Sequence, residues 1–161
     1  MKKKFIIGLM AILLLPLQVF AASIDLSKYN TTNLEETLKA EGITADLSNY
    51  KENDNQVVIY LFRGQGCAHC EEFLEYVGNT LIGKFNNNIK LVSFETWNDS
   101  NNKKLLNTVA TFLGDEAGGV PYIVIGDKSF LGYASSINSE IEAAVTALAN
   151  SKNRYDVFEE I

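Results

Sequence analysis

The chain has 161 residues, which is enough for one domain with a hydrophobic core and too short for two domains of ordinary size. Hydrophobic residues make up 47% of it, an ordinary share for a globular protein. Without residues 1–21 the 14 basic residues lose three lysines, which leaves 14 − 3 = 11 against 20 acidic residues and a formal charge of −9. So acidic a chain argues against nucleic acid and anionic lipid as partners.

The first 21 residues have the pattern of a secretory signal peptide. Lys2-Lys3-Lys4 is the charged start, Phe5 to Leu15 is the apolar core, and Val19-Phe20-Ala21 supplies small residues for cleavage after Ala21. An uncleaved anchor is the alternative, but an apolar core of about eleven residues is short against the roughly 20 that a spanning helix needs. We therefore predict an exported protein, secreted or in the cell envelope, with membrane attachment only if this segment is retained.

Composition and motifs divide the rest of the chain into three parts. We predict an N-terminal extension over 22–55, a main domain over 56–150 and a C-terminal tail over 151–161. In the extension, Thr32-Asn33-Leu34-Glu35 fits a capping box that opens a short helix, and Gly42 closes that helix.

Both cysteines and the only histidine of the chain lie in one short stretch, Cys67-Ala68-His69-Cys70. The apolar run from Val57 to Phe62 precedes it and predicts a buried strand. A helical pattern follows, with an apolar face made of Phe73, Leu74, Val77 and Leu81. This order places Cys67 at a helix N-terminus, where unpaired N–H groups and the helix dipole stabilise a thiolate.

The residues alone leave three uses of the cysteine pair open. A structural disulfide that closes so short a loop constrains the unfolded chain very little, because the entropy gain grows with loop length. Zinc takes four ligands, and two cysteines with one histidine leave that set incomplete without carboxylates or a second chain. Thiol–disulfide exchange needs this arrangement, so we interpret the pair as reactive and predict no metal and no cofactor.

The main domain continues with a strand, a helix, a hairpin and a last helix. We predict a strand over 89–97 and a helix that is capped within 98–102 and stops at Gly114. The inward face of this helix is formed by Leu105, Leu106, Val109, Phe112 and Leu113. A flexible acidic loop, Gly114 to Gly119, leads from it to Val120-Pro121.

The predicted hairpin consists of the strand 122–125, a turn over Gly126-Asp127-Lys128-Ser129, and the strand 130–133. A second capping box, Ser139-Glu140-Ile141-Glu142, opens the last helix. The element order predicts an α/β fold: a mixed sheet covered by helices on both faces, whose first two strands are parallel and whose last two are antiparallel.

This order, with Cys-x-x-Cys at the start of the helix after the first core strand, closely resembles the thioredoxin fold over roughly residues 55–150. Val120-Pro121 stands at the head of a strand, where thioredoxin-like proteins carry a cis-proline that faces the two sulfurs. Gly132-Tyr133-Ala134-Ser135 is similar to the Gly-x-x-Ser that ends the last strand of that family. The resemblance implies a thioredoxin fold with an N-terminal helical extension.

The resemblance also implies roles for individual residues. Cys67, exposed, forms the mixed disulfide with a substrate, and Cys70, less exposed, resolves it. Val120 and Pro121 present a strand edge to an extended substrate peptide. The partners are then protein dithiols or disulfides, with a further, unknown redox partner.

Cys-Ala-His-Cys is most similar to the Cys-Gly-His-Cys of protein disulfide isomerases and the Cys-Pro-His-Cys of exported DsbA-type oxidases. His69 can donate to the Cys67 thiolate or favour it by charge, or it can simply point to solvent. A stabilised thiolate makes the disulfide a stronger oxidant: such proteins lie at about −180 and −120 mV, against about −270 mV for thioredoxin. The motif therefore favours oxidation or isomerisation over reduction.

Two positions depart from the family pattern. Many members carry a buried acid six residues before the first cysteine, as a proton acceptor for the second thiol, and here that residue is Leu61. Thioredoxins and isomerases have a tryptophan directly before the first cysteine, and here it is Gly66. The candidate replacements for the acid are Glu71, Glu72 and Glu95.

The sequence thus predicts an exported thiol–disulfide oxidoreductase that acts through Cys67, Cys70 and His69. The alternative is a thioredoxin-fold binding or accessory protein whose cysteine pair is a redox sensor. Leu61 and Gly66 favour this alternative, because both depart from the enzymes of the family.

Overall fold

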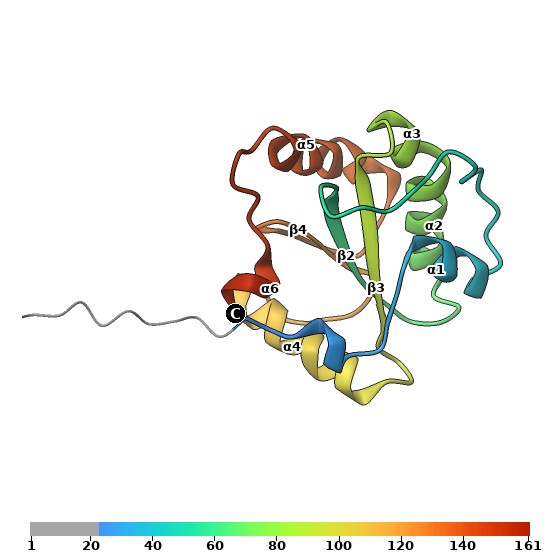
Figure 1. Cartoon of the computed structure of the whole chain (residues 1–161). Coiled ribbons are helices and arrows are strands. Elements are labelled where there is room, and N and C mark those ends of the chain that lie inside the picture. Colours follow the sequence, from blue (N-terminus) through green and yellow to red (C-terminus); the bar gives the residue numbers. More distant parts are fainter. Residues whose placement is uncertain (1–22) are drawn as a thin grey trace, which may run out of the picture.

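The computed structural model describes residues 23–161, so the predicted signal peptide and its cleavage site lie outside the described residues. A sheet of five strands in the order β1-β3-β2-β4-β5 forms its centre (Figure 1). The strands are β1 Thr31–Thr32, β2 Val57–Arg63, β3 Ile89–Glu95, β4 Tyr122–Ile125 and β5 Lys128–Leu131. β2 runs parallel to β3, and every other pair is antiparallel.

The helices are α1 Leu34–Ala40, α2 Ala68–Tyr76, α3 Ile82–Lys84, α4 Ser100–Leu113, α5 Asn138–Ala149 and α6 Val157–Glu160. A π-helix, Val77–Leu81, joins α2 to α3, so the three form one continuous helical segment. Short 3-10 helices occupy Leu26–Lys28 and Ser135–Ile137.

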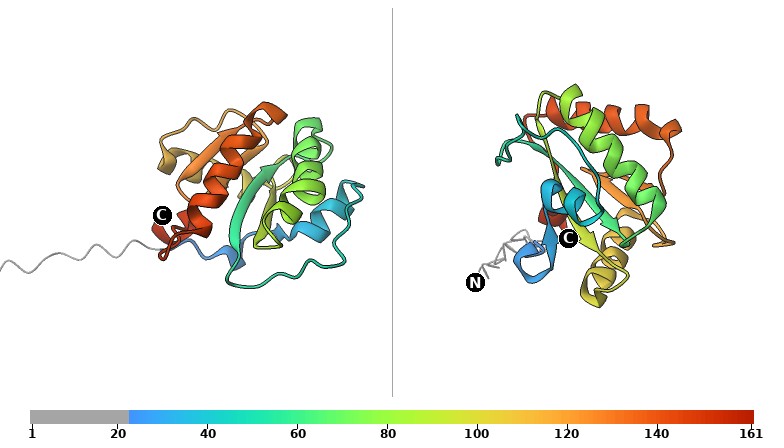
Figure 2. Two further views of the ribbon diagram at one scale, coloured as in Figure 1. Left: turned by 90° about the horizontal axis from the view of Figure 1, so that it is seen from above. Right: turned by 90° about the vertical axis from the view of Figure 1, so that its right-hand side faces the viewer.

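Side chains of β2 alternate between two hydrophobic cores, because successive residues of a strand point to opposite faces. Ile59 and Leu61 lie in the core that α1, α2 and α5 cover. Tyr60 and Phe62 lie in the other core, which α4 and α6 cover. Figure 2 shows the helices on the two sides of the sheet. The structure therefore confirms the predicted mixed α/β sheet and has the strand order and helix placement of a thioredoxin fold.

The edge strand β1 is absent from the predicted order. It pairs two residues of the N-terminal segment with Phe94 and Ser93 of β3. Two residues are too few to show the alternation by which a strand is found in a sequence.

Both predicted capping boxes need correction. The first lies one residue later than predicted: Asn33 caps α1, and the side chain of Glu36 closes the box. The second does not form, because α5 begins at Asn138 directly after a 3-10 turn, and its cap residue makes no side-chain cap hydrogen bond. A chain that enters a helix from a 3-10 turn lacks the extended N-cap residue that such a box requires.

Three further details differ from the sequence prediction. β3 ends at Glu95 rather than at Trp97. The hairpin turn is tighter than predicted, because Lys128 already pairs with Ile125. Phe112 is 46% exposed, so it does not belong to the inward face of α4, although Leu105 and Val109 do.

The C-terminal segment packs on the sheet through α6. The Phe158 side chain is 3% exposed, and its ring contacts the rings of Tyr60 and Phe94, with centroid distances of 4.4 and 5.8 Å. Asp156, which caps α6, accepts a hydrogen bond of 2.6 Å from the Tyr60 hydroxyl. Residues near the end of the chain therefore complete the core beside α4.

We predict that Phe158→Ala lowers the free energy of unfolding by about 3–5 kcal/mol, the usual cost of a buried phenylalanine. Phe112→Ala is the matched control, since this half-exposed ring (46% exposed) should cost less than about 1 kcal/mol. Urea unfolding followed by circular dichroism measures both. Equal losses for the two variants would contradict the packing described for α6.

Candidate active site

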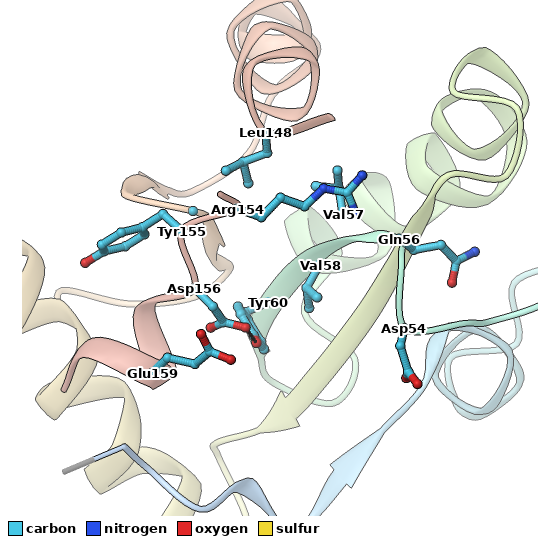
Figure 3. A pocket seen from close by; sticks show the side chains of 11 residues that line it. Asp54, Gln56, Val57, Val58, Tyr60, Leu148, Arg154, Tyr155, Asp156 and Glu159 are labelled. Carbon is cyan, nitrogen blue, oxygen red and sulfur yellow. Dashed lines mark hydrogen bonds between the residues drawn. The ribbon is translucent and has the colours of Figure 1, made fainter. Parts of the chain in front are cut away.

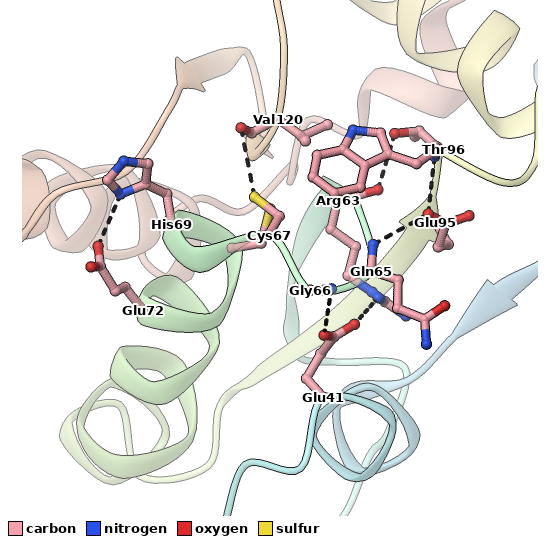
Figure 4. Close-up of a disulfide and its surroundings, with 12 residues drawn as sticks. Glu41, Arg63, Gln65, Gly66, Cys67, His69, Glu72, Glu95, Thr96 and Val120 are labelled. Carbon is pink, nitrogen blue, oxygen red and sulfur yellow. Dashed lines mark hydrogen bonds and ion pairs between the residues drawn. A yellow bond between two sulfur atoms is a disulfide. The ribbon is translucent and has the colours of Figure 1, made fainter.

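The two cysteines form a disulfide at the junction of β2 and α2 (Figure 4). Cys67 is the N-cap residue of α2, and its side chain makes no cap hydrogen bond. Its carbonyl accepts from the N–H groups of Cys70 and Glu71, at 2.9 and 3.0 Å. A thiolate at Cys67 would therefore occupy the position in which an N-cap side chain accepts from the free N–H groups of a helix.

Cys67 is 8% exposed and Cys70 is 1% exposed. The description of Cys67 as exposed is therefore wrong for the disulfide form, in which the Val120 carbonyl lies beside its sulfur. The order of exposure is as predicted, with Cys67 more exposed than Cys70.

The proline segment faces the disulfide. The Val120–Pro121 peptide bond is cis, as the family resemblance implies. The carbonyl oxygen of Val120 lies 3.9 Å from the Cys67 sulfur, although more than fifty residues separate them in the chain. The carbonyl of Pro121 accepts a hydrogen bond from the N–H of Gly132, the first residue of the predicted Gly-x-x-Ser. The structure thus brings Cys67, Val120 and Pro121 together.

His69 does not contact the disulfide. Its Nδ1 lies 3.1 Å from a carboxylate oxygen of Glu72, and its side chain is 66% exposed. Figure 4 shows the ring beside Glu72. This position matches the interpretation in which His69 faces solvent, and an effect of His69 on the Cys67 thiolate stays a prediction for the reduced pair.

The position of the family's buried acid is apolar here, because Leu61 is fully buried in the core beneath α2. None of the three proposed replacements takes over that position. Glu72 pairs with His69 on the surface, and Glu95 accepts hydrogen bonds from the backbone N–H groups of Trp97 and Asn98. Glu71 lies in the first turn of α2.

A buried carboxylate nevertheless lies close to the cysteines, and the sequence analysis missed it. Glu41, the C-cap residue of α1, forms an ion pair with Arg63, the last residue of β2. Its second oxygen accepts a hydrogen bond of 3.1 Å from the N–H of Gly66. The one available signal was the arginine, since a charged side chain that ends a buried strand requires a partner.

Two carboxylates therefore hold consecutive N–H groups of the loop before Cys67. Glu41 accepts from Gly66, and Glu95 accepts from Gln65 at 3.3 Å (Figure 4). The loop also needs the freedom of glycine at Gly66, which has a φ of +72°. We call Glu41 and Glu95 the carboxylate clamp.

Trp97 covers the same loop. A β-carbon placed on Gly64 would lie 2.1 Å from Cδ2 of the Trp97 ring, so the ring lies directly against the Gly64 backbone. The ring is 60% exposed. A tryptophan thus stands beside the loop before Cys67, although it comes from the turn after β3 rather than from position 66.

Asp115 anchors the loop that leads to Val120. Its carboxylate accepts hydrogen bonds from the hydroxyls of Tyr122, at 2.6 Å, and Ser129. The Ser129 hydroxyl, with the Tyr122 hydroxyl as the second cause, lowers the pKa of Asp115 below its usual value. The start of this loop is therefore tied to β4 and β5.

A cavity lies at the far end of β2 from the disulfide (Figure 3). It is lined by Val58, Tyr60, Arg154 and Asp156, among others, and Arg154 donates to the carbonyl of Asn55. Burial, with the Asp156 carboxylate as the second cause, raises the pKa of Tyr60. The cavity has a volume of about 170 Å³, which is below the roughly 300 Å³ of the smallest usual ligand pockets. We therefore assign this cavity to the packing of the C-terminal segment.

Within residues 23–161, no group of three or more His, Cys, Asp or Glu side chains is arranged to hold a metal ion. No helix in this part of the chain has the length and apolarity to cross a membrane.

Gly64→Ala should displace the Trp97 ring, because the added methyl group would overlap it. Since this is the only tryptophan of the chain, we expect its emission to be quenched more strongly by acrylamide in the variant. Gly83→Ala is the control, because a β-carbon there meets nothing within 4 Å. Unchanged quenching in Gly64→Ala would contradict the contact.

We expect Asp115→Ala to cost about 1 kcal/mol or less, the scale of an exposed charge-assisted hydrogen bond. A folded-state pKa below the unfolded value means stability that is fully present above about pH 4 and is lost as the pH falls through the folded pKa. The stability difference between wild type and variant should therefore shrink in acid. Exposed Glu116, mutated to Ala, is the control, and a difference that stays constant down to pH 2 would refute the assignment.

Comparisons with known proteins add a weak structural similarity. No protein-family model matches the chain, and no curated protein matches it. Among solved structures, a glutaredoxin (grx-1) from Archaeoglobus fulgidus is similar at 22% sequence identity, over 56% of this chain and 94% of that chain, with a TM-score of 0.37. A likeness at this level carries no argument about activity. The function therefore has to be inferred from the site itself.

Proposed function

We propose that this chain is a thiol–disulfide oxidoreductase that exchanges disulfides with protein substrates through Cys67 and Cys70. The observation that carries the proposal is a disulfide whose more exposed residue, Cys67, is the N-cap residue of α2, with its sulfur beside the Val120 carbonyl. A disulfide across so short a loop adds little stability. Reactivity explains its position better than a structural role does.

In the oxidising direction, a substrate thiolate attacks the sulfur of Cys67. The Cys67–Cys70 bond breaks, Cys70 leaves as a thiolate that takes up a proton, and a mixed disulfide joins Cys67 to the substrate. A second substrate thiolate then attacks the substrate sulfur of that bond and releases Cys67. Two electrons pass to the protein, and a disulfide-bearing partner must accept them for the next cycle.

The residues around Cys67 support this chemistry in three ways. The N-terminus of α2 favours the Cys67 thiolate over the thiol, which makes Cys67 the better leaving group. The near-complete burial of Cys70, at 1% exposed, shields it from direct attack, so it leaves as a thiolate in the oxidising direction and resolves the mixed disulfide in the reverse direction. The backbone at Val120, beside the cis-proline, offers an extended peptide a strand edge next to the sulfur.

The proposal also includes a direction of exchange, oxidation or isomerisation, and a location outside the cytoplasm. The pattern of residues 1–21 supports export, into an oxidising compartment where a disulfide oxidant or isomerase acts. The histidine between the cysteines supports oxidation or isomerisation, in that a protonated His69 would add positive charge near the Cys67 thiolate.

Two observations favour a second candidate, a binding or accessory protein whose cysteine pair is a redox sensor. The 8% exposure of Cys67 leaves little of the disulfide open to a bulky protein substrate, and Leu61 supplies no proton acceptor. Such a protein would change state on oxidation but would form no covalent complexes with other proteins.

The cysteine variants separate the two candidates. Cys67→Ser should abolish dithiol oxidation and insulin reduction, and Cys70→Ser should trap mixed disulfides with substrates in the exporting cell. The double variant Cys67→Ser, Cys70→Ser is the matched control and should trap nothing. Full activity in Cys67→Ser would overturn the proposal, and an empty Cys70→Ser trap would favour the sensor.

The reduction potential of the Cys67–Cys70 pair tests the direction. Equilibration with glutathione buffers should give a value closer to the roughly −180 to −120 mV of isomerases and oxidases than to about −270 mV. A thioredoxin-like value would indicate a reductase instead and would remove the role proposed for His69.

A further inference from the structure

A buried ion pair lies beside the loop that leads to Cys67. The side chains of Arg63 and Glu41 are 5% and 3% exposed and contact each other directly. Arg63 also donates from Nε to the hydroxyl of Ser93, at 2.9 Å. Buried charges are retained only where they are paired and hydrogen-bonded, and this pair meets both conditions.

The ion pair is connected to the active-site loop through Glu41. One carboxylate oxygen contacts Arg63, and the other accepts from the N–H of Gly66, the residue directly before Cys67 (Figure 4). The same carboxylate therefore neutralises a buried cation and holds the loop. Glu41 comes from the N-terminal extension rather than from the sheet or α2.

The two charges of this pair act on Cys67 in opposite directions. A guanidinium near a sulfur favours the thiolate, whereas a carboxylate disfavours it. Charges away from bulk water act more strongly than exposed ones, since the effective dielectric constant there is about 20 rather than about 80. The effects of the two charges on Cys67 therefore largely cancel. If either charge is removed, the remaining one acts on Cys67 with little screening by water.

We propose that Glu41 is a positioning residue of the dithiol site, which balances the charge of Arg63 and fixes the Gly66 N–H, and so sets the equilibrium between the disulfide and the dithiol. This inference rests on the proposed exchange at Cys67. In a glutathione buffer the equilibrium is balanced by two thiols: the Cys67–Cys70 bond breaks, two glutathione thiols join in a disulfide, and two electrons and two protons pass to the cysteines.

Glu41→Gln keeps a hydrogen-bond acceptor for Gly66 and removes the negative charge. The unbalanced Arg63 should favour the Cys67 thiolate and with it the reduced form. We expect the equilibrium constant with glutathione to shift about tenfold toward the dithiol, which corresponds to about 30 mV. The reaction of Cys67 with iodoacetamide should begin at lower pH in this variant. An unchanged equilibrium constant would overturn the proposal.

The double variant Glu41→Gln, Arg63→Met separates charge from geometry. Both charges are then absent, so the equilibrium constant should return to within about threefold of the wild-type value, which is well below the tenfold that corresponds to about 30 mV. Arg63→Met alone should move it toward the disulfide, because the unbalanced Glu41 carboxylate disfavours the Cys67 thiolate. If all three variants shift it the same way and by similar amounts, the ion pair acts only through the shape of the loop, and charge balance is wrong.

The exposed Glu35 on the same helix gives the matched control, since Glu35→Gln removes an equal charge away from the ion pair. Its equilibrium constant should stay at the wild-type value.

A further test needs no substitution: the Gly66 N–H and Arg63 Nε–H resonances of the reduced wild-type protein should shift as Cys67 is titrated. If the chemical shifts of these resonances stay constant through the titration, the inference is overturned, even if Glu41→Gln fails to fold.

These outcomes are distinct from those of the proposed function. The equilibrium with glutathione requires the dithiol and disulfide alone, and it can be measured in a sensor as well as in an enzyme. An empty Cys70→Ser trap would therefore reject the enzyme and leave the role of Glu41 to be decided by its own variants.

Discussion

The pairing of β2 with both of its neighbours is the constraint on which the site depends. β2 runs parallel to β3 and antiparallel to β4, so the end of β2, the end of β3 and the start of β4 meet at one edge of the sheet. The register places Arg63 opposite Glu95 and Phe62 opposite Tyr122. The positions of Cys67, Trp97 and the cis-proline follow from this register, because each lies within five residues of a paired position. A shift by one residue would also exchange the two cores that β2 separates.

The sequence was sufficient for the elements that carry a strong pattern. β2 and α2 were predicted because an apolar run and a helical face flank Cys67 and Cys70, and the family resemblance rested on the same residues together with Pro121. The contacts between distant segments could not be predicted from the sequence. Glu41 lies 22 residues before its partner Arg63 in a segment with no redox motif, and only the packing of α1 on the sheet brings the two together. Exposed Phe112 shows the converse, since it fits the helical period of α4, yet the core contacts its neighbour Leu113 and leaves Phe112 half-exposed.

The carboxylate clamp changes the interpretation of the two family departures. Leu61 and Gly66 looked like losses, because the family acid and the family tryptophan are missing from those positions. The structure has a buried carboxylate and a tryptophan close by, supplied by other segments: Glu41 from the extension and Trp97 from the turn after β3. Glu41 differs from the family acid in one physical respect. It is already paired with a cation and bonded to a backbone N–H, so it suits charge balance and loop placement better than proton transfer.

This difference also makes the N-terminal extension part of the site. Leu34 and Leu38 of α1 lie in the core that covers one face of β2. Ala45, after α1, lies against Gly78 of the π-helix so closely that a β-carbon on that glycine would be 2.8 Å away from it. The extension is thus held on both sides of Glu41. A local opening of α1 would release Gly66 and leave Arg63 without its carboxylate partner, so the stability of the extension and the redox equilibrium of Cys67 and Cys70 should be linked.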